Sequence, residues 1–337
     1  MKRIYFYSSV KDIGLFETQK FYKIDIDILT DLGYEVSVTN KITDFFKFKQ
    51  YNIAYIYFYR YGLFVAIIAR LLCKKVFFTG GIDYLDQTYA SKKDLFIQSV
   101  FFKLCLMFST NCILVSTADL HNVMRIYKGR LSEKIKLSFH AFNVEKYKCE
   151  DYENKGYDFI TIAWMGTVQN VIRKGLDKAI ELFAALRQKY PEYRQSRFFI
   201  VGKQGGGSEF LKEKVKIQNV GEWVVFTGEM NEDEKVSLLK KSRFYFQLSY
   251  YEGFGVAAAE ALAAGNIVLN SGRGGLKDSV GEHGVYVDID SDINKQIDNI
   301  HLEIQKKNIE KLMVGSQYIA DCFSYEIRKR EMLNIVR

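Results

Sequence analysis

Residues 249–265 read SYYEGFGVAAAEALAAG and follow an apolar run at Phe244–Leu248. The order is that of a strand, a glycine-bearing loop and an alanine-rich helix. Glycines at positions 253 and 255 let backbone amides come close to a ligand, and the helix that begins there points free N–H groups and a positive dipole end at an anion. The segment therefore predicts an α/β domain with a diphosphate site at the start of one helix.

The alternation of strands and helices continues on both sides of this segment. Upstream of residue 149, apolar runs such as Ile4–Tyr7, Ile53–Tyr59 and Val76–Thr79 alternate with longer amphipathic stretches. Because such runs are apolar throughout, they predict parallel strands covered by helices on both faces. After residue 156 the expected strands are Phe159–Met165, Phe198–Val201, Val224–Thr227, Phe244–Leu248 and Ile267–Asn270, and the expected helices include Leu176–Lys189, Glu232–Lys241 and Ala257–Ala264.

Two doubly wound α/β domains are the expected architecture for a chain of 337 residues that is 48% hydrophobic. The charged, glycine-containing stretch 149–156 predicts the linker. The first domain is then expected at 1–148 and the second at 157–315. The last segment, residues 293–337, is amphipathic, and the pattern alone does not decide where it packs.

Charge is unevenly distributed along the chain. The net charge is +8, and residues 1–150 hold 22 Lys and Arg against 14 Asp and Glu, whereas residues 151–337 hold 26 of each. A basic first half favours anionic partners such as phospholipid surfaces, lipid phosphates or nucleic acid, and a merely soluble basic surface is the alternative. Nucleic-acid binding has no other support, so we predict none.

The cysteines and histidines predict neither disulfides nor a metal site. The five cysteines contain no CxxC pair, which indicates a reduced, cytoplasmic compartment. The four histidines are scattered and no carboxylate cluster has metal-site spacing. The N-terminus does not read as a signal peptide, because acidic and amide residues soon interrupt its apolar run.

Two glutamates and a pair of cations are the candidate functional groups. Glu252 precedes the alanine-rich helix and Glu260 lies about one and a half turns inside it, a separation that suits contacts on two sides of a diphosphate. For Glu260 a solvated helix position is the alternative. Arg173 and Lys174 open the helix that follows the strand ending at Trp164-Met165-Gly166-Thr167. Two cations at a helix start are unfavourable for the helix dipole unless an anion lies nearby. A solvated surface pair is the alternative.

These motifs together resemble the E-x7-E region of retaining GT-B glycosyltransferases of family 4. The resemblance implies two domains facing each other across a cleft, with residues 316–337 crossing back as a C-terminal helix onto the first domain. It implies that Glu252 contacts the donor sugar, that Glu260 binds the ribose, and that Lys174, with Arg173, neutralises the departing diphosphate. Further donor contacts implied by the resemblance lie at Gly14, Gly166, Thr167, Gly253, Phe254, Gly255 and Val256.

The function implied is metal-independent transfer of a sugar from a UDP-, GDP- or ADP-sugar, with no cofactor besides this donor. The acceptor is expected to be a glycan or a lipid-linked glycan in cell-surface polysaccharide synthesis. Asp83, after a strand of the first domain, is a candidate on the acceptor side. Alternatives are a nucleotide-sugar epimerase of the same fold and a catalytically silent nucleotide-binding scaffold.

The aromatic stretch Tyr55–Leu72 suggests a second kind of partner. It carries Arg60 and Arg70 and is too short and too interrupted to span a bilayer. With the excess charge of the first half, it predicts peripheral contact with an anionic membrane, on its inner face. Core burial beneath the sheet is the plainer interpretation of the same residues.

Overall fold

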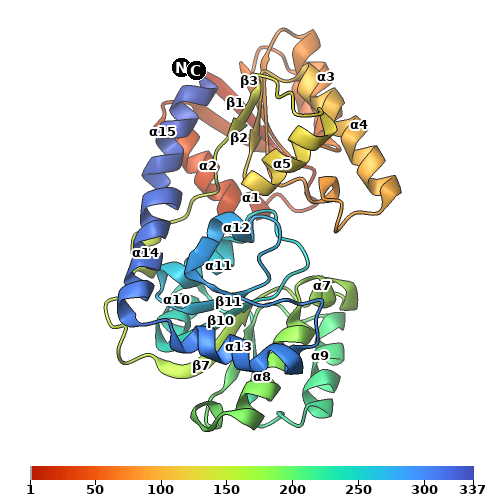
Figure 1. Cartoon of the computed structure of the whole chain (residues 1–337). Coiled ribbons are helices and arrows are strands. Elements are labelled where there is room, and N and C mark those ends of the chain that lie inside the picture. Colours follow the sequence, from red (N-terminus) through yellow and green to blue (C-terminus); the bar gives the residue numbers. More distant parts are fainter. Residues whose placement is uncertain (1) are drawn as a thin grey trace. The chain divides into compact units, whose positions relative to one another are not determined.

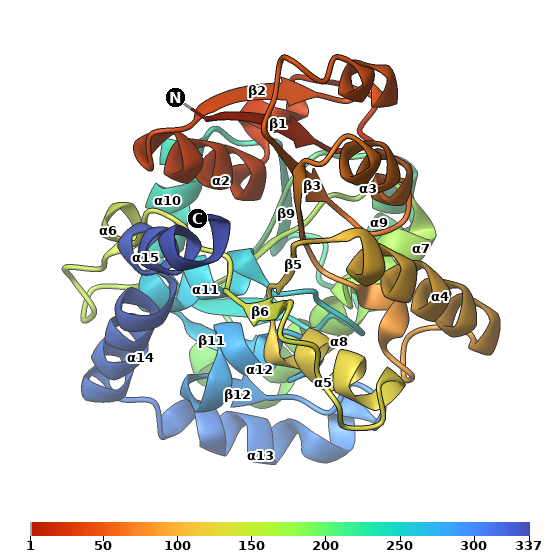
Figure 2. The ribbon, with the colours of Figure 1, turned by 90° about the horizontal axis from the view of Figure 1, so that it is seen from above.

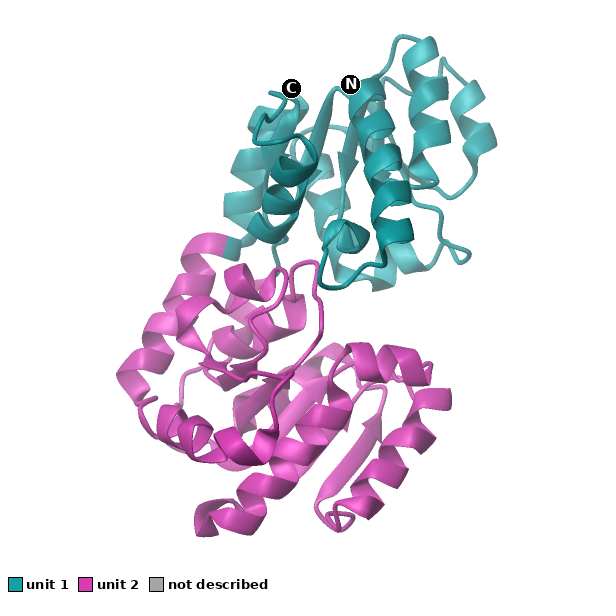
Figure 3. Ribbon diagram, turned by 45° about the vertical axis from the view of Figure 1, so that its right-hand side comes forward, with its two compact units in different colours: residues 1–142, 323–337 teal, residues 143–322 magenta. Residues whose placement is uncertain are grey.

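The computed structural model describes residues 2–337 and divides into two compact units. Unit 1 comprises Met1–Phe142 together with Phe323–Arg337, and unit 2 comprises Asn143–Cys322 (Figure 3). Each unit contains a six-stranded, fully parallel sheet with helices on both faces in the described part of the chain. The prediction of two doubly wound α/β domains is confirmed.

Unit 1 is built on a sheet with the strand order β2-β1-β3-β4-β5-β6. Its central strand β3 is buried along its whole length, as expected for an apolar strand between two helical layers. The strands are β1 (Arg3–Tyr7), β2 (Glu35–Thr39), β3 (Ile53–Tyr57), β4 (Lys75–Thr79), β5 (Asn111–Leu114) and β6 (Ile135–Leu137). The helices are α1 (Leu15–Thr18), α2 (Lys20–Asp31), η1 (Ile42–Phe46), α3 (Gly62–Leu71), η2 (Asp83–Leu85), α4 (Lys92–Phe108), α5 (Thr117–Ile126) and α15 (Tyr325–Val336).

Unit 2, whose strands β7, β10 and β11 are labelled in Figure 1, repeats the plan with the strand order β12-β11-β10-β7-β8-β9. The strands are β7 (Gly156–Ile162), β8 (Phe198–Val201), β9 (Val224–Gly228), β10 (Ser242–Gln247), β11 (Ile267–Asn270) and β12 (Val285–Tyr286). The helices are α6 (Val144–Tyr147), α7 (Val168–Arg173), α8 (Leu176–Lys189), η3 (Pro191–Tyr193), α9 (Gly206–Ile217), α10 (Glu232–Lys241), α11 (Val256–Ala263), α12 (Leu276–Ser279), η4 (Gly281–His283), α13 (Ile293–Gln305) and α14 (Ile309–Phe323).

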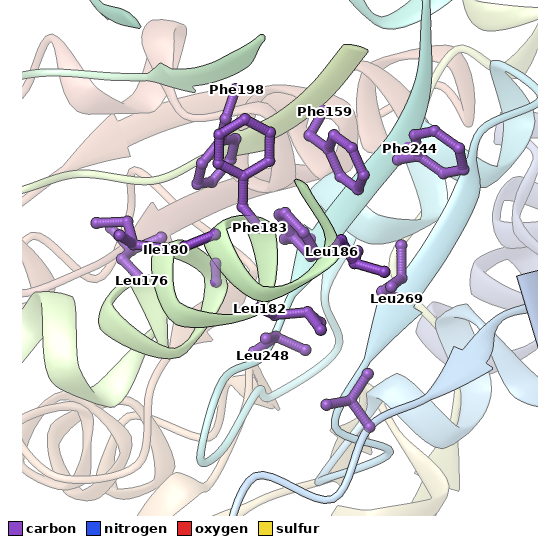
Figure 4. Packing of buried hydrophobic residues seen from close by; sticks show 14 of the residues in the cluster. Phe159, Leu176, Ile180, Leu182, Phe183, Leu186, Phe198, Phe244, Leu248 and Leu269 are labelled. Atoms are coloured by element: carbon purple, nitrogen blue, oxygen red, sulfur yellow. The ribbon is translucent and has the colours of Figure 1, made fainter. Parts of the chain in front are cut away.

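Aromatic side chains of neighbouring strands form the centre of the unit 2 core. The ring of Phe159 on β7 stacks on Phe244 of β10 at a centroid distance of 4.4 Å, and Phe183 of α8 meets it edge-on at 5.3 Å (Figure 4). Such pairs add about 0.5–1.5 kcal/mol to the burial of their area. Local signals agree with this packing: Asn231 caps α10 by accepting from the N–H of Glu234, whose side chain accepts in return from the N–H of Asn231.

The C-terminal helix α15 belongs to unit 1, where it packs beside α2 (Figure 2). The Arg328 guanidinium donates to both carboxylate oxygens of Asp25, at 2.6 and 2.8 Å, and both side chains are fully buried. Asp25 also accepts from the hydroxyls of Tyr55 and Tyr57. Burial alone would raise the pKa of Asp25, but the adjacent Arg328 outweighs it and lowers this pKa.

The change between units falls later in the chain than the expected position Ser316. Residues 316–322 belong to unit 2, because the Ser316 hydroxyl donates to the carbonyl of Ala263 and the Tyr318 hydroxyl to that of Asp278. The expected linker 149–156 also lies in unit 2. The chain leaves unit 1 at Phe142 and returns at Phe323, where the N–H of Phe142 donates to the carbonyl of Phe323 at 3.2 Å.

Candidate active site

The strand order of unit 2 places its two predicted motifs next to each other. Its first strand, β7, pairs with its fourth, β10, and the chain winds away from this pair in opposite directions. In sheets of this kind, ligands bind beyond the carboxyl ends of the strands at the point where the order reverses. The segment 163–175 follows β7 and the segment 248–255 follows β10, so the sequence motifs flank this point.

Direct contacts join these two segments. Lys174 Nζ donates to Glu252 Oε1 at 2.5 Å, and the N–H of Tyr250 donates to the carbonyl of Arg173 at 2.8 Å. The guanidinium of Arg173 donates in turn to the carbonyl of Tyr251 at 3.4 Å. The structure therefore brings three of the predicted residues, Arg173, Lys174 and Glu252, into one cluster.

Glu252 is held as a carboxylate in a buried environment. The residue is only 8% exposed, and the same oxygen that meets Lys174 accepts from Ser249 Oγ at 2.7 Å and from Gln247 Nε2 at 2.9 Å. Burial acts to raise the pKa of Glu252, but the charge and the hydrogen bond of Lys174 outweigh burial and lower this pKa. All three donors meet Oε1 of Glu252, so its other carboxylate oxygen can accept from hydroxyl groups of a ligand.

The expectation that Arg173 and Lys174 lie only at the start of a helix is wrong. Arg173 ends the short helix α7 and Lys174 is its C-cap, so the two cations lie at the favourable, negative end of that helix as well as before α8. The sequence interpretation missed α7, whose first turn is capped by the hydroxyl of Thr167, 3.2 Å from the N–H of Asn170. Gly175 then turns the chain at φ 65°, where a Cβ atom would lie 1.9 Å from the carbonyl oxygen of Leu248. Only glycine allows the pair to approach the end of β10 this closely.

The start of α11 supplies the predicted backbone donors. Gly255 adopts φ 91° before the helix begins at Val256, so the N–H groups of Val256 and Ala257 have no partner within the helix. The loop after β11 supports this turn, because the N–H of Gly275 donates to the carbonyl of Glu252 at 2.7 Å. Anions bind favourably where such N–H groups meet the positive end of the helix dipole. The predicted site residues Gly253 and Phe254 lie in the same turn, and the side chain of Phe254 is buried.

Glu260 is buried, so the alternative of a solvated helix position is wrong. The residue is 3% exposed, and Glu260 Oε2 accepts from Lys235 Nζ of α10 at 3.2 Å. Lys235 also pairs with Glu232 Oε2 at 3.0 Å, and the hydroxyl of Tyr147 donates to Glu232. Burial, with the nearby Glu260, raises the pKa of Tyr147 far above its ordinary value. The sequence interpretation missed Lys235, Glu232 and Tyr147, because they come from α6 and α10.

Gly166 and Thr167 lie beside a second glycine-rich turn. A Cβ atom on Gly207 would lie 2.6 Å from the carbonyl oxygen of Thr167, and one on Gly205 would lie 2.9 Å from the Cα atom of Gly166. These glycines therefore permit close packing of two backbones at the ends of β7 and β8. The observed packing therefore gives Gly205 and Gly207 a structural role.

The remaining predicted site residues lie in unit 1. Gly14 is exposed at the start of α1 with φ −61°, and its N–H donates to Asp12 Oδ1 at 2.9 Å. Asp83 begins η2, after β4, and is half-buried. Their roles toward donor and acceptor stay predictions.

Two of the four histidines, His140 and His301, pack against other aromatic side chains. Burial, with Arg328 adding to it, lowers the pKa of His140 to about 3, and His301 stacks on Tyr190. Within residues 2–337 no group of three or more His, Cys, Asp or Glu side chains could hold a metal ion. None of the helices in this range combines the length and hydropathy that crossing a membrane requires.

Half of the residues in the aromatic stretch Tyr55–Leu72 are buried in the core, as in the plainer of the two interpretations. Tyr55, Tyr57 and Tyr59 are buried in the sheet, and Val65 and Ala66 of α3 pack beneath it. A smaller set of its side chains remains exposed on the outer side of α3.

Comparison with known proteins adds a family match for unit 2. Residues 161–314 match the family described as glycosyl transferases group 1. The GDP-mannose:cellobiosyl-diphosphopolyprenol alpha-mannosyltransferase of Xanthomonas campestris is 26% identical over 139 residues, covering 41% of this chain and 34% of that protein. The D-inositol 3-phosphate glycosyltransferase of Salinispora tropica is 31% identical over 145 residues, covering 41% of this chain and 29% of that protein. The matches thus span about a third of the length of these relatives.

Solved structures match the whole chain. Anabaena Alr3699/HepE in complex with UDP-glucose aligns with a TM-score of 0.76 at 16% identity, covering 100% of this chain and 99% of that one. Sucrose-phosphate synthase from Thermosynechococcus elongatus aligns with a TM-score of 0.74 at 16% identity, covering 100% and 98%. The chain thus has the GT-B fold, and its residues 161–314 are similar to the family of group 1 glycosyl transferases.

Proposed function

We propose that the chain is a retaining glycosyltransferase of the E-x7-E type that moves a sugar from a nucleotide-diphosphate sugar to an acceptor without a metal ion. One observation carries the proposal: Lys174, Arg173 and the N-terminus of α11 surround Glu252 at the strand-order reversal of unit 2. Two cations and a helix start form an anion site, and the carboxylate beside them accepts hydrogen bonds from sugar hydroxyls.

In the proposed reaction, the bond between the anomeric carbon and the diphosphate oxygen breaks, and its electron pair goes to the departing diphosphate. Lys174, Arg173 and the amides of residues 253–256 stabilise the negative charge that develops there. The acceptor hydroxyl forms the new bond on the same face of the sugar and passes its proton to the diphosphate. The enzyme contributes by holding both partners in position, so no protein nucleophile is needed.

The two glutamates take separate parts in this proposal. Glu252 receives hydroxyl groups of the donor sugar, and its ion pair with Lys174 holds both groups at the anomeric side of the diphosphate. Glu260 lies about one turn from the start of α11 and binds the ribose hydroxyls. Lys235 holds its side chain in place. Gly166, Thr167 and Gly14 approach the donor, and Asp83 serves the acceptor.

The comparisons support a nucleotide-sugar donor. Alr3699/HepE has been solved with UDP and with UDP-glucose, while the Xanthomonas relative is named for GDP-mannose. The name of that relative also supports a lipid-linked acceptor for this chain, at the cytoplasmic face of a membrane in polysaccharide synthesis. Neither the epimerase nor the silent scaffold gains support from the family match.

A thermal-shift screen against UDP-, GDP- and ADP-sugars tests donor binding. A ligand at about one hundred times its Kd stabilises the folded chain by about 2.7 kcal/mol, which is readily measured. The donor found in this way is then incubated with candidate glycan acceptors, and the anomeric configuration of the product is read by NMR. Transfer with retained configuration is the expected result. Transfer with inversion, or no stabilisation by any of the three nucleotide classes, contradicts the proposal.

A further inference from the structure

Two neighbouring helices of unit 1 expose large apolar side chains on their outer sides. The inner sides of α3 and α4 enter the core through residues such as Val65 and Phe102. The outer sides carry side chains that are between 37% and 77% exposed. We call this set the α3–α4 face; its members are Phe64, Leu71, Phe96, Val100, Leu104 and Met107.

The members on α4 follow the helical repeat. Phe96, Val100, Leu104 and Met107 are spaced four, four and three residues apart, so they form one stripe along the helix. A surface helix of a globular protein normally presents polar residues outward, and contiguous exposed apolar patches mark interaction sites. Singly exposed apolar residues need no such explanation. The stripe therefore indicates an interaction surface.

Cations border the α3–α4 face. Lys92 and Lys93 stand at the start of α4, Lys103 lies between its exposed apolar residues, and Arg60 and Arg70 flank those of α3; all five residues are exposed. Among residues 2–337, none of the five forms an ion pair. The single acidic residue of α4, Asp94, accepts from the hydroxyl of Ser91 at the helix start.

We propose that the α3–α4 face docks on the surface of an anionic phospholipid bilayer, with α4 lying in the plane of the interface. An apolar stripe with a cationic border is the pattern of interfacial helices, since the stripe enters the acyl boundary and the cations meet lipid phosphates. Lysine favours this occupant over a protein, because protein interfaces are depleted in lysine. Long lysine side chains can reach phosphates while their stems stay in contact with apolar surroundings.

Within Tyr55–Leu72 this inference keeps only the outer side of α3 for the expected membrane contact, and it adds α4. It uses none of the groups assigned to sugar transfer, and it accords with the proposed lipid-linked acceptor without depending on it. The excess of basic residues in the first half of the chain acts in the same direction, through attraction to anionic lipid.

Vesicle flotation of the full chain tests the docking surface. Vesicles contain either phosphatidylcholine alone or phosphatidylcholine mixed with phosphatidylglycerol. The apolar variant combines Phe96→Ser, Val100→Ser, Leu104→Ser and Met107→Ser, and the charge variant combines Lys92→Gln, Lys93→Gln and Lys103→Gln. A matched control, Ile217→Ser with Leu302→Ser, removes exposed apolar side chains from unit 2. Circular dichroism and thermal melting verify that each variant folds.

We expect binding to the anionic vesicles that weakens with salt, and a loss of about tenfold or more in partitioning for each α4 variant, with none for the control. Equal vesicle binding of the wild type and the α4 variants overturns the proposal. Wild-type binding that is equal on neutral and anionic vesicles also overturns it. Sedimentation velocity without lipid examines the competing occupant: a wild-type dimer that the apolar variant abolishes assigns the face to a second copy and refutes the membrane. The donor thermal shift is measured on the same variants, so failure of membrane docking is distinguished from failure of the proposed transferase.

Discussion

Replacing Lys174 by alanine tests the centre of the candidate site most directly. The change removes the ammonium group 2.5 Å from Glu252 and leaves a carboxylate that is 8% exposed. Ser249 and Gln247 continue to donate to it, so the group keeps two hydrogen bonds and loses its counter-charge. Leaving a buried charge in this state costs about 1–3 kcal/mol of folding stability. Burial raises the pKa of Glu252 and Lys174 is the largest influence lowering it, so this pKa should rise in the variant.

The effect on sugar transfer is expected to exceed the effect on stability. If Lys174 stabilises charge on the departing diphosphate, its loss should lower kcat by about 10²–10³-fold, equivalent to about 2.7–4 kcal/mol, as found for single groups that stabilise developing charge. Lys212→Ala is the matched control, because Lys212 is exposed and paired only with Glu209 of the same helix. Such surface pairs contribute about 0–1 kcal/mol, and the control should leave kcat unchanged.

The double variant Lys174→Ala with Glu252→Gln separates the two roles of the lysine. An amide needs no counter-charge, so urea denaturation should show part of the lost stability restored. Steady-state kinetics should show that activity stays low, because the charge facing the diphosphate is still missing. A Lys174→Ala enzyme that transfers sugar at near wild-type rates would refute electrostatic stabilisation by this group. Recovery of activity in the double variant would show that Lys174 acts only as the partner of Glu252.

Three further predictions concern stability. Burial lowers the pKa of His140 to about 3, so the folded state excludes a proton that the unfolded chain binds below about pH 6.5. The free energy of unfolding in urea should therefore fall by about 2 kcal/mol between about pH 7.5 and pH 5. His140→Leu should remove this part of the pH dependence. Arg328→Met leaves the carboxylate of Asp25 buried without its counter-charge and should cost about 3–5 kcal/mol in chemical denaturation. Lys329→Ala, at a partly exposed position paired with Asp31, should cost about 0–1 kcal/mol. Lys155 donates to three carbonyl groups at the ends of α10 and α11. Lys155→Met should therefore lower the free energy of unfolding by about 1–3 kcal/mol and speed amide hydrogen exchange at both helix ends. Unchanged exchange there would argue against this capping role.

Sequence patterns predicted most of the strands and several of the longer helices, because these depend on local periodicity. α8 and α10 begin and end at the predicted residues. The short helix α7 was missed, since six residues are too few for a periodic signal, and with it the favourable position of Arg173 and Lys174 at a helix end.

The contacts of Glu260 show a second limit of sequence reasoning. Its partner Lys235 is 25 positions away and belongs to a different helix, so only the packing of α10 against α11 brings the two together. An amphipathic count of either helix treats both side chains as solvated. Pairing of this kind depends on the order of strands in the sheet, and no local window contains that information.

The membrane surface that we propose differs in part from the predicted stretch for a similar reason. Composition predicted an interfacial segment at Tyr55–Leu72 because a count of apolar and basic residues does not tell which side of an element they occupy. In the structure, β3 and the inner side of α3 fill the core. α4 is apolar on both sides, with Phe102 and Leu106 inward and the Phe96 stripe outward. A helix that is apolar all round is expected to be buried on all sides. In this fold α4 exposes one side at the surface of unit 1, and that exposed side, which a periodicity count does not identify, is the surface that we propose for membrane docking.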